Sequence, residues 1–412
     1  MNNVSRNLRE LAVRIHSNQA DEGNLGARLA TALNWDTTEV RRQQLFADKP
    51  ETPISKGLIG SQPAAIFLAD LHVGLQRLIN AGALYAYHAS IEWGLVTNAT
   101  DIVIFNSHWV RKGHWFHLPS IPWEKFDSYI DLFEAVTPEG LTYGKIEQVA
   151  ARFFEPDRLL MPVDDALVDR LDHWRDEAMR FTSAPESVDQ TINQLFAQMF
   201  VLRAVEDRRL APEVPSLDSL VDPYGKVAVG ALAALFKTAH THLQSELFDD
   251  KTVLNIPPAI LGGIITDLYV PPQLPVENAR YNFAWIDADI LGRAYEKYLA
   301  ELLVPSSRRN PQLSLLDEPV RESDRVSVRK AAGIYYTPQY LVNYLTEYCL
   351  DAFFESEEGN NRLPRVADLS CGSGSFLIAA RQFGDSKVSL SRSVAELGTR
   401  DHRSETDHRY RQ

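Results

Sequence analysis

The segment from Val366 to Ala379, V-A-D-L-S-C-G-S-G-S-F-L-I-A, constrains the fold of this chain more than any other. A short apolar run ends in Asp368, a turn rich in glycine and serine follows, and apolar residues resume at Phe376. This pattern predicts a strand that stops, turns tightly and leads into a helix. Glycines let the backbone pass close to a ligand, and the start of the helix offers unpaired N–H groups. We therefore expect a nucleotide-like ligand at this turn, although such turns also occur in many other folds.

A second motif, G-I-Y-Y-T-P, occupies residues 333–338 and lies upstream of the glycine-rich turn. Thr337 suits the N-cap of a helix, and Pro338 suits its first helical position. Apolar residues then recur at helical spacing, which predicts a helix through Leu341, Leu345, Tyr348 and Cys349. A capped helix is thus expected to lead into the strand before the glycine-rich turn.

Together, G-I-Y-Y-T-P and D-L-S-C-G-S-G-S-F resemble the start of the methyltransferase domain of adenine-N6 DNA methyltransferases. Within these, the chain is most similar to the type IIG restriction-modification and BREX-like phage-defence enzymes. The resemblance implies site-specific methylation of double-stranded DNA with S-adenosylmethionine as cofactor. In that family the Y-T-P segment and the glycine loop hold the cofactor. Carried over residue by residue, the resemblance assigns cofactor binding to Tyr336, Thr337, Pro338, Asp368, Cys371, Gly372 and Gly374.

Length and composition limit the class of protein. The 412 residues are enough for two or three domains, and two cysteines are too few for a disulfide framework or a four-cysteine zinc site. No run approaches the roughly 18 apolar residues of a membrane span, and the N-terminus lacks a signal peptide. We therefore expect a cytoplasmic protein with no membrane partner. The net charge of −13 argues against a uniformly basic surface, but a local basic groove would suffice for DNA.

The first 125 residues predict an α/β domain. Residues 1–48 have a helical pattern, and the Pro, Gly and Ser content of residues 51–62 predicts a loop. A buried strand at 64–68, a helix through 71–79 and strands at 93–96 and 102–105 follow. This order resembles the N-terminal nuclease-like domain of the same restriction family.

In the family, that domain carries an E-x-K pair after the first of these strands and T-N-G at the end of the next. Two carboxylates hold Mg²⁺ there, and the lysine orients or activates water. The present chain has Asp70-Leu71-His72 and Thr97-Asn98-Ala99 at these positions. Asp70 and His72 are the candidates for the nuclease site, and the alternative is a polar strand end. Because the lysine is missing, we expect a domain that keeps the nuclease shape without a metal site or DNA cleavage.

Residues 108–117, H-W-V-R-K-G-H-W-F-H, combine aromatic and basic side chains. They could stack on bases and contact phosphate. The favoured interpretation is a two-stranded hairpin whose aromatic rings pack on the preceding sheet.

Residues 126–304 predict a helical middle domain, with one core-facing stripe formed by Ile192, Leu195, Phe196, Met199 and Leu202. The charged run 203–208 is expected to pair within its helix on a solvated face, and a phosphate contact is the alternative. Residues 305–330 are polar and predict a linker. The expected fold is therefore a nuclease-like α/β domain, a helical domain and the start of a Rossmann-like methyltransferase domain over 331–383.

The methyltransferase domain is expected to be incomplete. Adenine-N6 transfer in the family uses an Asn or Asp followed by Pro-Pro and an aromatic residue, which grips the flipped adenine. Neither Asn255-Ile256-Pro257-Pro258 nor Asp222-Pro223-Tyr224 fits this motif, and both precede the glycine loop. Residues 384–412 are polar and predict a disordered tail. No catalytic residue is expected in this chain.

Three functions remain open. The chain is an N-terminal part of an adenine-N6 methyltransferase, inactive alone and needing a second polypeptide, or a non-catalytic DNA-binding or partner-binding module of a defence system. The third and less favoured function is a weak Mg²⁺-dependent nuclease activity at Asp70.

Overall fold

A computed structural model of the chain describes residues 3–17, 24–36, 38–60, 62–153, 156–180, 185–248 and 256–298, the last with short gaps, and then residues 337, 339–356, 364–369, 371 and 374–384. Met1–Tyr298 form one compact unit and Leu299–Gln412 a second. The predicted linker at 305–330 and nearly all of the predicted tail at 384–412 lie outside the described residues. In the described part of the chain, no helix has the length and apolar character needed to cross a membrane.

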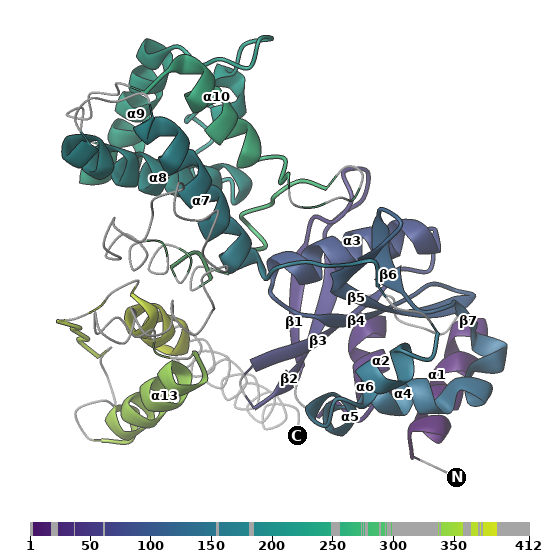
Figure 1. The fold of residues 1–412 in the computed structure, drawn as a ribbon. Helices are drawn as coiled ribbons and strands as arrows, with labels where there is room; N and C mark the ends of the chain where they lie inside the picture. Colours follow the sequence, from purple (N-terminus) through teal and green to yellow (C-terminus); the bar gives the residue numbers. More distant parts are fainter. Residues whose placement is uncertain are drawn as a thin grey trace, which may run out of the picture. The chain divides into compact units, whose positions relative to one another are not determined.

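The first unit contains an eight-stranded mixed sheet (Figure 1). Its main path runs in sequence order from β1 to β6, and the short strands β7 and β8 both pair with β5. β3 and β4 are parallel and are joined by helix α3 (Leu75–His88), whereas all other pairs are antiparallel. The strands are β1 (Thr38–Gln43), β2 (Thr52–Ile59), β3 (Gln62–Ala69), β4 (Trp93–Thr97), β5 (Asp101–Arg111), β6 (His114–His117), β7 (Ile121–Pro122) and β8 (Arg158–Leu159).

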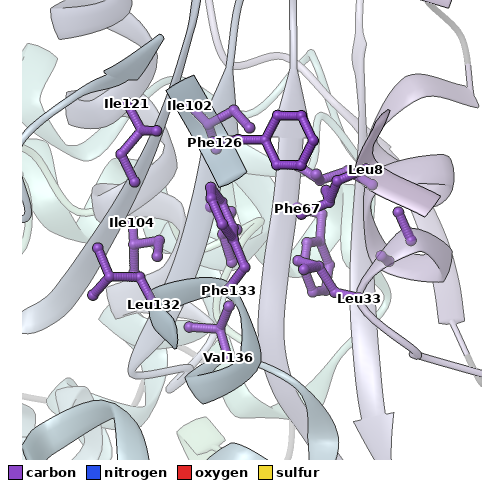
Figure 2. Packing of buried hydrophobic residues seen from close by; sticks show 14 of the residues in the cluster. Leu8, Leu33, Phe67, Ile102, Ile104, Ile121, Phe126, Leu132, Phe133 and Val136 are labelled. Atoms are coloured by element: carbon purple, nitrogen blue, oxygen red, sulfur yellow. The ribbon is translucent and has the colours of Figure 1, made fainter. Parts of the chain in front are cut away.

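Helices cover both faces of this sheet, which explains the continuous apolar sequences of its central strands. Ala65 to Ala69 of β3 are all buried, whichever way their side chains point. One face packs against α3, where Gly82 lies close to Val96 and Phe105. The other face carries the large hydrophobic cluster shown in part in Figure 2. Its helical side consists of α1 (Asn3–His16), α2 (Leu25–Ala32), a 3₁₀ helix (Trp123–Tyr129), α4 (Ile130–Ala135), α5 (Pro138–Thr142) and α6 (Lys145–Ala150).

The hydrophobic core continues past residue 125, where the sequence suggested a domain boundary. Phe126, Phe133 and Ile146 belong to the same cluster as Phe67 of the sheet (Figure 2 labels the first two and Phe67). The Trp35 indole N–H also donates to the Val136 carbonyl, at 3.1 Å. The helices from 130 to 150 are only five or six residues long, too short for a periodic pattern to reveal which core they join.

Two expectations for the N-terminal region are wrong. Residues 38–43 form strand β1 within the stretch predicted to be helical, and residues 52–59 form β2 where a loop was predicted. The glycine of β2 has a packing role: a Cβ at Gly57 would lie 2.4 Å from the Trp35 ring. Gly57 also marks an irregularity in the register with β3. Gly57 is therefore explained by close packing within a strand and not by a loop.

The predicted aromatic hairpin is confirmed. β5 and β6 pair through Val110 with Trp115 and through Arg111 with His114. The connecting residues Lys112 and Gly113 both have positive φ, 51° and 77°, as a type I′ turn requires. Trp115 is buried, so its ring belongs to the core and not to an exposed stacking surface.

The rest of the first unit is helical, and the stripe of α8 predicted from Ile192 to Leu202 is buried as expected. Its charged end differs from the prediction. Arg203 does pair within the helix, with Glu206 at 3.1 Å and Asp207 at 2.7 Å, but its side chain is 1% exposed. The helices are α7 (Val163–Met179), α8 (Pro185–Asp207), α9 (Val229–Leu243) and α10 (Pro258–Asp267), with 3₁₀ helices Leu217–Leu220 and Glu246–Phe248.

Candidate functional site

The glycine-rich turn of the second unit opens a helix, as predicted. Gly374 has φ of +84°, which disfavours any residue with a Cβ, and its N–H donates to the Cys371 carbonyl at 2.7 Å. Residues 375–384 are helical, and the first turn is closed by the Ile378 N–H donating to the Gly374 carbonyl at 2.9 Å. Cys371 and Gly374, two of the predicted cofactor residues, thus lie in one hydrogen-bonded turn at the N-terminus of a helix.

The strand predicted before this turn is not formed. Residues 364–368 have no strand pairing, Val366 is 47% exposed and Leu369 is 99% exposed. A parallel strand needs neighbours that accept and donate its ladder hydrogen bonds. The described part of the second unit contains no other strand, so this prediction of a strand is wrong for the chain as it stands. Asp368 is half-buried on this segment, three positions before Cys371.

The Y-T-P motif is only partly described. Thr337 lies two positions before α13 (Gln339–Glu355), whereas Tyr336, Pro338 and Gly372 lie outside the described residues. The helix predicted from the spacing of the apolar residues is present as α13. Leu341, Leu345, Tyr348 and Cys349 are exposed, and the buried positions are Val342, Thr346 and Leu350.

The described residues fit one edge of a site for S-adenosylmethionine. A left-handed glycine with open space around its Cβ position and a helix N-terminus suit a ligand that approaches the backbone closely. Leu369 is 99% exposed, whereas the adjacent Asp368 is half-buried. The turn is therefore compatible with the cofactor, and its opposite wall is not among the described residues.

The predicted nuclease site of the first unit holds an internal ion pair. Asp70 follows β3, and both of its carboxylate oxygens contact the Lys49 Nζ, at 2.9 and 2.7 Å. The same carboxylate accepts the His72 backbone N–H at 2.9 Å. A lysine therefore does lie beside Asp70, contrary to the lysine-free site expected from the sequence. It comes from the segment before β2, so the E-x-K spacing gave no signal for it.

A second ion pair adjoins the first. Arg77 of α3 donates to the Asp48 carboxylate through Nη1 and Nη2, and its guanidinium lies 4.7 Å from the centre of the Phe46 ring. The Arg77 hydrogen bond lowers the pKa of Asp48 below its ordinary value. Two ion pairs thus link the segment before β2, which carries Asp48 and Lys49, to Asp70 after β3 and Arg77 of α3.

The residues that replace T-N-G build a turn. The Asn98 side chain accepts the backbone N–H groups of Thr100 and Asp101, and the Thr97 hydroxyl donates to the Asp101 carbonyl at 2.9 Å. No group of three or more His, Cys, Asp or Glu side chains that could hold a metal occurs among the described residues. The polar atoms at this end of the sheet are therefore engaged in local structure.

The chain is similar to the Escherichia coli protein named type II restriction enzyme and methyltransferase RM.Eco57I. The two are 26% identical over 315 residues, which cover 73% of this chain and 29% of the E. coli protein. The chain therefore spans well under half the length of this relative. No protein-family model matches the chain, and no solved structure does. The similarity supports a protein related to restriction-modification systems.

Proposed function

We propose that the chain is an N-terminal portion of a site-specific DNA adenine-N6 methyltransferase of a restriction-modification or phage-defence system. The observation that carries the proposal is the left-handed Gly374 at the N-terminus of helix 375–384, in a chain similar to a restriction enzyme and methyltransferase. Thr337, Asp368, Cys371 and Gly374, with the undescribed Tyr336, Pro338 and Gly372, would hold the cofactor.

S-adenosylmethionine supplies an electrophilic methyl group when bound. The chain's own part would be to place the cofactor: the backbone near Gly374 approaches it, and Asp368 supplies a carboxylate for its polar groups. An acceptor-base motif would have to come from further sequence or a second polypeptide. The nuclease-like domain is proposed to bind without cleaving, because His72 stands at the position of the family's lysine and the Lys49 that lies beside Asp70 is engaged in an ion pair with that carboxylate.

The test is calorimetric titration of the full chain with S-adenosylmethionine. We expect saturable binding that is weakened about tenfold or more in Asp368→Ala, since a lost carboxylate contact costs roughly 1.5–3 kcal/mol. The matched control is Glu347→Ala, which removes an exposed carboxylate from α13 of the same unit and should bind like the wild type. Absence of binding by a folded wild-type chain would contradict the cofactor assignment.

The second candidate is a non-catalytic DNA-binding or partner-binding module of a defence system. The exposure of Val366 and Leu369 beside the glycine turn favours it, since an open site holds a cofactor poorly. DNA binding that persists while S-adenosylmethionine binding is absent would select this candidate.

A further inference from the structure

A buried polar junction lies where helix α3, strand β5 and the start of helix α7 meet. Tyr87 of α3 is 0% exposed, and its hydroxyl has no hydrogen-bond partner among the described residues. The Nε2 atom of His108 on β5 is also buried, and it too has no such partner in the described part of the chain. Neither group belongs to the proposed cofactor site or to the nuclease-like site. Because buried polar atoms are nearly always hydrogen-bonded, this pair requires a physical explanation.

The backbone brings the polar groups of this junction together. The Tyr87 and His108 rings lie edge to face, with centroids 5.9 Å apart. The register between β5 and β6 shifts between Asn106 and Val110, so His108 lies in an irregular part of the strand, where bulges re-aim side chains. The His108 carbonyl accepts the Leu160 N–H at 2.7 Å, which holds the chain before α7 against β5.

A carboxylate completes the junction. Asp164 lies in the first turn of α7, four positions after Leu160, and is buried. Its charge acts on both rings: it raises the pKa of Tyr87 and opposes the lowering of the pKa of His108. A buried carboxylate at the start of a helix is favoured by the helix dipole, so Asp164 is expected to be ionised.

Burial fixes the hydrogen-bonding roles of the two rings. It raises the pKa of the Tyr87 hydroxyl above its ordinary value, so the hydroxyl keeps its proton and can donate. It lowers the pKa of His108 below 6.5, and the Glu92 and Asp164 charges offset this only in part. The junction therefore combines a hydroxyl donor, a neutral imidazole and a carboxylate.

A water molecule has the hydrogen-bonding capacity that these groups require. It can accept from the Tyr87 hydroxyl, donate to the Asp164 carboxylate, and either donate to or accept from His108 Nε2. Buried waters typically make about three hydrogen bonds to polar groups that would otherwise be unsatisfied. A metal ion fits less well, because the described residues contain no group of three or more His, Cys, Asp or Glu side chains that could hold one.

We propose that the junction of α3, β5 and α7 is a binding site for one ordered water, held by Tyr87 Oη, His108 Nε2 and the Asp164 carboxylate. The water links the start of α7 to the sheet of the first unit. The inference is independent of the proposed function.

The first test is the thermal unfolding of Tyr87→Phe, which removes only the hydroxyl oxygen. We expect the midpoint to fall by about 2–4 °C, because the water and its remaining partners lose one hydrogen bond. A hydroxyl that is truly unsatisfied gives the opposite result, since its removal relieves a desolvation cost. A midpoint equal to or above that of the wild type would therefore overturn the inference. The matched control is Tyr143→Phe, whose side chain is 67% exposed and whose midpoint should be unchanged.

The second test is a crystal structure of the full chain at a resolution that shows ordered waters. We expect a water within roughly 2.6–3.2 Å of both Tyr87 Oη and His108 Nε2. A direct hydrogen bond from Tyr87 to His108 or to Asp164 would also lower the midpoint of Tyr87→Phe, and its presence in the crystal would contradict the water site. Either result leaves the proposed function intact, because Tyr87 belongs to the first unit and the cofactor residues to the second.

Discussion

At the scale of single residues, the buried polar side chains of the first unit serve to join segments that are distant in sequence. Arg203 illustrates this: its guanidinium lies 3.8 Å from the centre of the Tyr269 ring and 5.3 Å from that of Phe283, and its Nε donates to the Leu268 carbonyl. A solvated face would leave such a residue free to contact phosphate. Here it connects α8 to the segment after α10.

His88 has a similar joining role at the end of α3. Its Nδ1 lies 2.6 Å from the Leu84 carbonyl, and its Nε2 accepts the Asn282 backbone N–H at 3.3 Å. Only the neutral ring with its proton on Nδ1 satisfies both contacts. Burial lowers the pKa of His88 from 6.5 to about 4, so the folded protein resists protonation there.

The stability of the protein should therefore fall as the pH falls below 6.5. The unfolded chain takes up a proton at His88 near pH 6.5, whereas the folded chain does so near pH 4, so the stabilisation is complete above 6.5 and is lost toward 4. From about pH 7.5 to about pH 5 the expected loss in unfolding free energy is about 2 kcal/mol. Urea titrations across this range measure it. In His88→Phe the loss over the same interval should be smaller by this amount, while His108, whose pKa is also lowered by burial, still contributes. An unchanged slope would refute the assignment to His88.

At the scale of elements, glycine positions decide how closely helices and turns approach. Gly262 of α10 faces the backbone of Gly225, where a Cβ would lie 2.0 Å from the carbonyl oxygen, and Gly263 faces the Trp174 ring, where a Cβ would lie 2.3 Å from a ring carbon. Gly230 in α9, in contrast, has no atom within 4 Å of its Cβ position. The same residue type thus has a packing role in one helix and none in the other.

Gly262→Ala should destabilise the protein by about 1–3 kcal/mol, because the added methyl group meets backbone that must move. Gly230→Ala is the matched control: alanine favours the helix by up to about 1 kcal/mol, so this variant should be neutral or slightly more stable. Thermal unfolding followed by circular dichroism at 222 nm, the usual signal of helix content, compares the two. Equal midpoints for both variants would be inconsistent with the close contact at Gly262.

At the scale of the whole first unit, charged contacts link strands β1 and β2 of the sheet to Asp287, which lies in the segment after α10. Asp287 accepts the Arg41 Nη1 of β1 at 3.2 Å and lies 3.8 Å from the Lys56 Nζ of β2, whose side chain is 2% exposed. The Tyr85 and Trp285 rings pack edge to face beside this pair, with centroids 5.7 Å apart. The carboxylate thus bridges two strands and a segment over 200 positions later.

Asp287→Ala should lower the unfolding free energy by about 1–2 kcal/mol, since Lys56 is buried while Asp287 itself is partly exposed and screened. It should also speed proteolysis in the 268–287 segment. Lys145→Ala, which breaks an exposed pair with Glu139, is the control and should change stability by less than about 0.5 kcal/mol. The proposed bridge would be wrong if the two variants were equally stable.

The sequence by itself determined the features that depend on neighbouring residues. The glycine turn at Cys371–Gly374, the Lys112-Gly113 hairpin turn and the continuous apolar strand around Phe67 all follow from local backbone preferences and apolar runs. Each of these features can be recognised from a few adjacent residues.

Only the tertiary structure decided which distant segments share a surface. It placed Lys49 on Asp70, buried Arg203 between aromatic rings, made β2 a strand that packs against Trp35, and left residues 364–368 outside any sheet. The physical reason is that ladder hydrogen bonds, ion pairs and ring packing depend on residues many positions away in the sequence. A local pattern does not specify which distant segment will supply those residues.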